Sequence, residues 1–83
     1  MKNKKIKIKL KSSESIKEFI KMAENYKSDV DIMTDRATVD AKSIIGVLAL
    51  DLTGDIYVRI ISDDIAECRK FEAEMEEFRW LIR

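Results

Sequence analysis

The chain of 83 residues contains no histidine and no proline, and it has only two glycines and one cysteine. Without histidine it lacks the commonest general base, the commonest metal ligand and a ring nitrogen to carry a phosphoryl group. With only Gly46 and Gly54, it has no glycine-rich phosphate-binding loop. The single Cys68 forms no disulfide within the chain and offers no metal-ligand spacing. We therefore expect no metal, no cofactor and no redox chemistry.

Long apolar runs are also absent. None approaches the roughly 20 residues that cross a bilayer, and the lysine-rich start lacks the uninterrupted apolar segment of a signal peptide. We therefore expect a cytoplasmic protein without membrane contact. Hydrophobic residues make up 46% of the chain and charged residues 39%, which is typical of a globular protein. The length predicts a single domain over residues 1–83 with one shared core.

The charges sum to zero but are unevenly distributed. Residues 1–27 hold nine lysines against three glutamates, which raises the question of nucleic acid binding. However, Ile6, Ile8 and Leu10 alternate with the early lysines, and this is the pattern of a strand with one solvated face. We favour the solvated face and expect no direct nucleic acid partner.

Hydrophobic spacing predicts seven secondary-structure elements. These are a strand over 5–10, a helix over 15–27, two hairpin strands that hold Val30 and Ile32 and then Val39 and Ala41, a short helix from Ser43, a strand over 56–61 and a long helix from Asp63. The order is β-α-β-β-α-β-α. Because the central hairpin makes neighbouring strands antiparallel, we expect an α+β fold, an open-faced β-sandwich with helices on one face of a four-stranded antiparallel sheet.

Local signals predict where the helices begin and end. Ser15, with Glu18 three residues later, predicts a capping box at the start of the first helix. In the short helix, Ile44, Val47 and Leu48 are expected to form an apolar stripe over about two turns, with Leu52 as a further candidate, and Gly54 is expected to end the helix.

In the long helix, Cys68 falls on the apolar stripe and is expected to be a small buried hydrophobic residue. The stripe comprises Ile65, Cys68, Phe71, Met75, Phe78 and Ile82. Trp80 lies off this stripe, and two alternatives remain open for it: it covers the end of the sheet or it meets another chain.

Three segments carry a resemblance to a known family: AENYKSDVDI, ATVDAKSIIGVLALDLTGD and IYVRI. Together with the element order, they resemble the HPr phosphocarrier family of the bacterial sugar phosphotransferase system and its HPr-like regulatory relatives. The most specific match is KSIIGVLAL, residues 42–50, which is similar to the family's signature around a regulatory serine. The resemblance covers nearly the whole chain and implies an HPr-like fold.

The family's other signature fails here. An HPr carries its phosphoryl group on a histidine at the start of the first helix, whereas this chain has LKSSESIKEF there, with Ser12, Ser13 and Ser15. A serine hydroxyl forms a stable ester rather than a phosphoramidate that passes its phosphoryl group on, so carrier chemistry is excluded and no catalytic residue is expected. The three serines either form a substitute anion site or serve structurally, with Ser15 as the helix cap. We favour the structural interpretation.

Ser43 also has two interpretations. As the N-cap of the short helix it contributes about 1 kcal/mol relative to alanine. As a phosphorylation site it would place the phosphate beside free N–H groups. The resemblance implies recognition of Ser43 by an HPr kinase/phosphorylase, and partner docking on Ile45 and Leu48. Lys42 either steers an anionic partner or is simply solvated.

Two functions follow from these observations. The first is a regulatory, non-carrier HPr-like protein controlled through Ser43; the resemblance implies a LacI-type catabolite regulator or phosphotransferase components as its partners. The alternative is a non-catalytic interaction or ligand-binding module on an HPr scaffold, with no remaining phosphotransfer role. An enzyme is poorly supported, because no catalytic constellation can be assembled from these residues.

Overall fold

The structure, a computed structural model, describes residues 4–79 of the chain. The elements are β1 (Ile6–Ile8), α1 (Ser13–Glu24), β2 (Asp29–Met33), β3 (Thr38–Asp40), α2 (Ile44–Leu48), β4 (Ile56–Ile61) and α3 (Ile65–Arg79). The predicted order β-α-β-β-α-β-α is confirmed. No helix within residues 4–79 is long and apolar enough to span a membrane.

The four strands form one antiparallel sheet in the order β1-β4-β2-β3. One row of paired residues crosses all four strands and faces the core: Ile6, Val58, Ile32 and Val39. Because successive residues of a strand point to opposite faces, the neighbouring row points to the other face. This second row consists of Lys7, Tyr57, Met33 and Thr38. The alternation predicted for the lysine-rich first strand is therefore confirmed.

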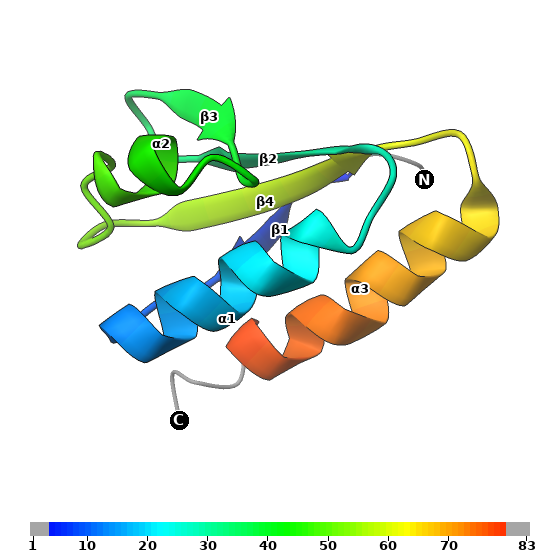
Figure 1. The fold of residues 1–83 in the computed structure, drawn as a ribbon, viewed down its shortest axis with the longest axis horizontal. Helices are drawn as coiled ribbons and strands as arrows, with labels where there is room; N and C mark the ends of the chain where they lie inside the picture. The colour runs from blue at the N-terminus through cyan, green and yellow to red at the C-terminus, as the bar shows by residue number, and fades with distance from the viewer. Residues whose placement is uncertain (1–3, 80–83) are drawn as a thin grey trace.

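All three helices lie on one face of the sheet. Figure 1 shows α1 and α3 side by side across that face. A Cβ atom placed on Gly46 of α2 would lie 3.5 Å from the Cβ of Val39, which belongs to the core-facing row of the sheet. The predicted open-faced sandwich is therefore confirmed, and the opposite face of the sheet is left without a helix from residues 4–79.

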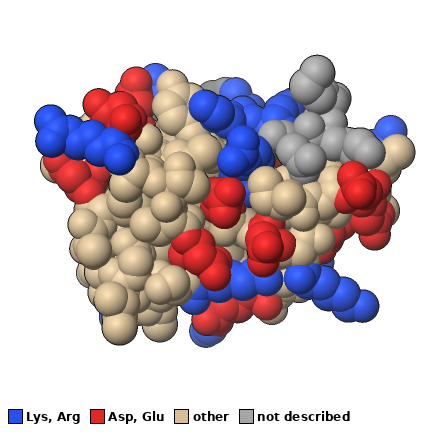
Figure 2. Space-filling view, turned by 90° about the horizontal axis from the view of Figure 1, so that it is seen from above, with Lys and Arg blue, Asp and Glu red and all other residues tan. Residues whose placement is uncertain are grey.

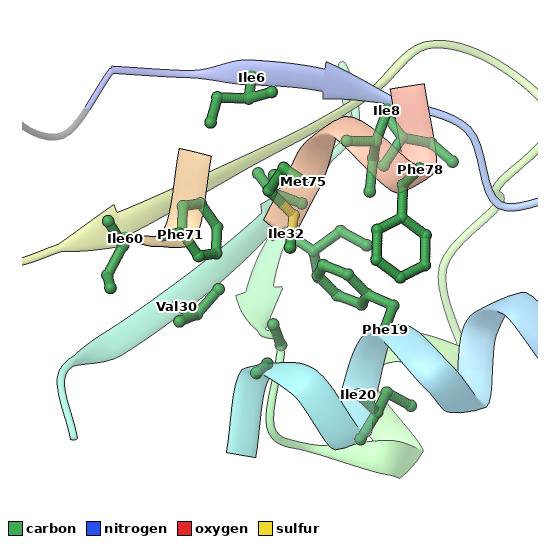
Figure 3. Packing of buried hydrophobic residues seen from close by; sticks show 14 of the residues in the cluster. Ile6, Ile8, Phe19, Ile20, Val30, Ile32, Ile60, Phe71, Met75 and Phe78 are labelled. Carbon is green, nitrogen blue, oxygen red and sulfur yellow. The ribbon is translucent and has the colours of Figure 1, made fainter. Parts of the chain in front are cut away.

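The core lies between the sheet and the helices (Figure 3). Phe19 of α1 and Phe78 of α3 meet edge to face, with ring centroids 5.7 Å apart. Cys68 is buried, as predicted. Ile65 is 59% exposed because it is the first residue of α3, and the prediction that it belongs to the buried stripe is wrong. Trp80 and Ile82 lie outside the described residues.

The start of α1 differs from the prediction. Ser12 is the N-cap, and its Oγ accepts a hydrogen bond from the N–H of Ser15 at 3.1 Å. The N–H of Ser12 donates in return to Oγ of Ser15, also at 3.1 Å. The capping box is thus Ser12 with Ser15, and the predicted box of Ser15 with Glu18 is wrong. A serine at the third helical position can accept the returning hydrogen bond that a glutamate usually accepts.

The end of α2 also differs. The helix ends at Leu48 with Ala49 as its C-cap, so Gly54 does not terminate it. The loop that follows is organised by Asp51, whose Oδ1 accepts hydrogen bonds from the N–H and the hydroxyl of Thr53 at 3.1 and 2.6 Å. These bonds lower the pKa of the Asp51 carboxyl below its ordinary value. An Asx turn therefore takes the place of the predicted last helical turn.

Candidate functional site

Ser43 begins α2 as its N-cap, as predicted. Its backbone is extended, with φ of −94° and ψ of 106°, and its Oγ accepts a hydrogen bond from the N–H of Gly46 at 3.1 Å. This bond satisfies one of the amide groups that a helix start leaves without a partner in the helix. The residue is exposed, so its hydroxyl is at the protein surface.

Gly46 allows α2 to pack close to the sheet. A Cβ atom at this position would lie 3.2 Å from Oγ of Ser43, which is tighter than ordinary van der Waals contact. A side chain there would press on the capping hydroxyl, and its Cβ would come into ordinary van der Waals contact with the Cβ of Val39. The glycine inside KSIIGVLAL therefore serves the cap and the contact between α2 and β3.

The outer surface of α2 is apolar. Ile44, Ile45 and Leu48 are 54%, 83% and 63% exposed, and we call these three residues the α2 patch. Only Val47 of this helix is buried. Of the predicted apolar stripe, only Val47 is buried in the core, because a helix of five residues presents only a narrow strip to it. The exposure of Ile45 and Leu48 agrees with the exposed patch that the resemblance implied. In Figure 2, uncharged side chains gather at the end of the molecule where Figure 1 places α2.

A groove of about 530 Å³ runs between α1 and α2. Ile16 and Ile20 of α1 face Ile44 and Leu48 of α2 across it. Ser13 lines the same groove near the start of α1. The structure thus brings the predicted docking residue Leu48 and one serine of the degenerate loop to a single depression. Ile45 is not part of the groove lining and lies on the outer side of the α2 patch.

The charged lining of the groove comes from α1. It consists of Glu14, Lys17, Glu18, Lys21 and Glu24. Acidic and basic groups alternate along the helix, so the rim is polar without a strong field of one sign.

Lys42 does not behave as a freely solvated side chain. Its ammonium group donates a hydrogen bond to the backbone carbonyl of Tyr26 at 2.6 Å, just beyond the end of α1. Its backbone N–H donates to Oδ1 of Asp40 at 2.9 Å. Lys42 therefore fastens the start of α2 to the end of α1, where a cation also interacts favourably with the exposed helix carbonyls.

The three serines of the degenerate loop have different surroundings. Ser12 and Ser15 form the capping box, and Oγ of Ser15 also donates to the carbonyl of Ser12 at 2.9 Å. Ser13 is exposed and lines the groove. Ser12 and Ser15 therefore have the structural role that we favoured, but the N-cap is Ser12 and not Ser15.

Sequence reasoning missed Ile16 and Ile44 as surface residues of this site. The missed signal is the run of seven uncharged residues from Ile44 to Leu50, which exceeds what a short helix can bury. Part of that run has to face the solvent or a partner.

A polar cluster away from α2 joins α3 to the residues just before β2 and just after β4. Glu67 accepts hydrogen bonds from the hydroxyls of Ser28 and Ser62, each at 2.6 Å, and these bonds lower the pKa of its carboxyl. Nearby, burial raises the pKa of Tyr26, and a hydrogen bond to Glu74 raises it further. These contacts join segments that are distant in the sequence, so we assign the cluster a structural role. No group of three metal-binding side chains occurs within residues 4–79.

Comparisons with known proteins agree with this architecture. The family described as "PTS HPr component phosphorylation site" matches residues 4–78. The crystal structure of HPr-C-His from Thermoanaerobacter tengcongensis superimposes with a TM-score of 0.71 and 26% sequence identity, covering 93% of each chain. No curated protein sequence matches significantly. The matched family extends over most of the chain, and the protein therefore belongs to the HPr family of the phosphotransferase system.

Proposed function

We propose that this protein is a regulatory member of the HPr family that does not carry phosphoryl groups, and that phosphorylation of Ser43 controls docking on the α2 patch. One observation carries the proposal: a chain without histidine keeps an exposed serine at the N-cap of α2, next to three exposed apolar side chains.

The absence of histidine decides against a carrier. A relay must accept a phosphoryl group and pass it on, which requires a nitrogen nucleophile that forms a labile bond. The exposed hydroxyl of Ser13 would form a stable ester instead. Phosphate on a serine of this chain therefore persists until an enzyme removes it, which suits a signal better than a relay.

Phosphorylation of Ser43 is compatible with the folded state. The phosphate oxygens can accept the hydrogen bond that Gly46 now donates to the hydroxyl. Because α2 has only five residues, its dipole is small, and the local N–H groups are the main stabilising contact. The helix start is therefore expected to remain in place after modification.

The modification changes what the α2 patch can bind. A phosphate adds a charge of about −1.5 to −2 beside Ile44 and Ile45. An apolar partner would then have to desolvate that charge, whereas a partner with an arginine gains charge-assisted hydrogen bonds. The expected modifying enzyme is an HPr kinase/phosphorylase, and the expected readers are a LacI-type catabolite regulator or phosphotransferase components in the cytoplasm.

A phosphorylation assay tests the site. The protein is incubated with an HPr kinase and ATP, and the modified residue is located by mass spectrometry. We expect one phosphate on Ser43 and none on the Ser43→Ala variant, while Ser13→Ala is modified like the wild type. No incorporation, or incorporation at Ser13, would refute the assignment.

A relay assay tests the non-carrier claim. Phosphoenolpyruvate and the general relay enzyme of the phosphotransferase system are expected to leave this chain unlabelled. Label that appears on it and then moves to a sugar-specific acceptor would overturn the proposal.

The alternative function, a plain interaction module, is favoured by the apolar lining of the α1–α2 groove, which exists without any modification. Binding to a LacI-type regulator distinguishes the two functions. In the regulatory case Ser43→Asp changes the affinity and Leu48→Asp abolishes binding, whereas Ile65→Asp, a matched exposed site on α3, has no effect. If Ser43→Asp leaves the affinity unchanged while Leu48→Asp abolishes binding, the protein is a plain interaction module.

A further inference from the structure

The face of the sheet opposite the helices carries an ordered row of charges. Arg59 of β4 lies opposite Asp31 of β2 in the strand register, and Asp31 lies opposite Asp40 of β3. Lys5 precedes β1 on the same face, because its ammonium group lies 6.0 Å from the centre of the Tyr57 ring. From the β1 side to the β3 side, the row therefore reads positive, positive, negative, negative. In Figure 2, basic and acidic side chains lie close to one another on the face seen from above.

The next row on this face is less charged. Met33 is only 7% exposed although it faces away from the core, and Tyr57 beside it is half-buried. Lys7 and Thr38 complete the row at the two sheet edges. Lys7 already pairs with Asp55 at 3.3 Å. The open face thus has an apolar centre, a basic side and an acidic side.

Such a row is complementary to itself under one particular symmetry. A two-fold axis parallel to the strands turns a second copy so that its β3 faces β1 and its β2 faces β4. Lys5 then lies over Asp40 of the second copy, Arg59 over its Asp31, and Tyr57 over its Met33. An axis across the strands would instead place lysine on lysine.

We propose that this open face is a self-complementary interface on which a second copy of the chain docks about a two-fold axis parallel to the strands. Two sheets of this kind pack about 10 Å apart with their strands aligned to within about 30°. The net charge of zero means that no overall repulsion opposes the association. A polyanion or polycation is a poorer match, because half of the row would repel it.

Arg59 has capacity for a further carboxylate. Its Nη2 lies 3.5 Å from Oδ2 of Asp31, which is a long contact, and its side chain is 32% exposed. A guanidinium group offers five N–H donors in a planar fork, so it can bind the carboxylate of a second copy while keeping its own. The interface lies on the face opposite α2, which leaves the α2 patch of both copies open.

Sedimentation equilibrium of the full chain tests the interface without any substitution. At low salt, the mass is expected to rise from 9.7 kDa towards twice that value with increasing concentration. Salt shortens the Debye length to about 3 Å at 1 M and so screens the charges of the row. We therefore expect the dissociation constant of the dimer to rise by roughly tenfold or more between low and high salt. Backbone NMR shifts are expected to change with concentration at Met33, Tyr57 and Arg59. A monomer at every concentration, or shifts confined to α2, would overturn the proposal.

Paired charge variants test the geometry. The variant Lys5→Glu with Arg59→Glu makes the row acidic, and Asp31→Lys with Asp40→Asn makes it basic; asparagine retains the acceptor that Asp40 offers to the N–H of Lys42. Each variant alone is expected to be monomeric, and an equimolar mixture is expected to restore a dimer.

The control is Lys17→Glu with Lys21→Glu on α1, which changes the charge by the same amount as the acidic variant and should leave the dimer intact. Circular dichroism confirms that each variant is folded. Folded variants that fail to form the mixed dimer, or an acidic variant that dimerises like the wild type, would refute the interface.

Discussion

Replacing Ser43 by alanine separates the structural role of this residue from its proposed regulatory role. The substitution removes the oxygen that accepts the hydrogen bond of the Gly46 N–H at 3.1 Å. Only Val47 of α2 is buried, so few other contacts hold this helix in place. Loss of an N-cap serine costs about 1 kcal/mol. In a domain of this size, such a loss lowers the melting temperature by about 4–8 °C.

Ser43→Asp is the informative companion, because aspartate caps a helix about as well as serine. We expect its free energy of unfolding to lie within about 0.5 kcal/mol of the wild type, even though it carries the negative charge that alters docking. Urea unfolding followed by circular dichroism measures both variants. If Ser43→Ala is as stable as the wild type, or if Ser43→Asp is destabilised as much as alanine, the capping argument is wrong.

Three further substitutions test the local structure. Val47→Ala is expected to cost about 2 kcal/mol in urea unfolding because it empties a buried site, whereas Ile45→Ser should change stability by less than about 0.5 kcal/mol. Ser12→Ala should cost about 1 kcal/mol as the loss of a cap; a loss no larger than that of Ser13→Ala would contradict the capping box. Folding lowers the pKa of the Glu67 carboxyl below its ordinary value of 4.5. The ionised carboxylate therefore stabilises the folded state fully above about pH 4.5, and this stabilisation is lost as the pH falls through the lower pKa of the folded state. The stability difference between Glu67→Gln and the wild type should therefore be largest near pH 7 and shrink below about pH 4.5 in acid titrations of unfolding.

The fold could be predicted from the sequence because its signals are local and repeated. In β4, Ile56, Val58 and Ile60 alternate with less buried residues, and this period of two determines which face meets the core. In α3, the spacing of Cys68, Phe71 and Met75 fits one helix face. The hairpin made β2 and β3 antiparallel neighbours, but the position of β4 between β1 and β2 does not follow from the element order alone.

The helix boundaries and the α2 patch could not be predicted in the same way. Ser12 and Ser15 are both good caps, and the sequence alone does not say which of them begins the helix. Helical spacing placed Ile44 and Leu48 on one face with Val47, but it does not say how wide a strip the sheet will cover. The groove depends on α1 and α2 lying side by side, which is a tertiary contact with no local signal.

The surroundings of Ser43 bear on how a phosphate there would be recognised. Lys42 is the nearest cation in the sequence, but its ammonium group is hydrogen bonded to the carbonyl of Tyr26 at 2.6 Å. To neutralise a phosphate on Ser43, it would have to give up that bond and release the end of α1. In our proposal the charge of the phosphate therefore stays largely uncompensated within the chain. The phosphate remains available to an arginine of the partner. Beside it, Ile45 of the α2 patch is 83% exposed, so its side chain contributes little to the fold and can contact the same partner.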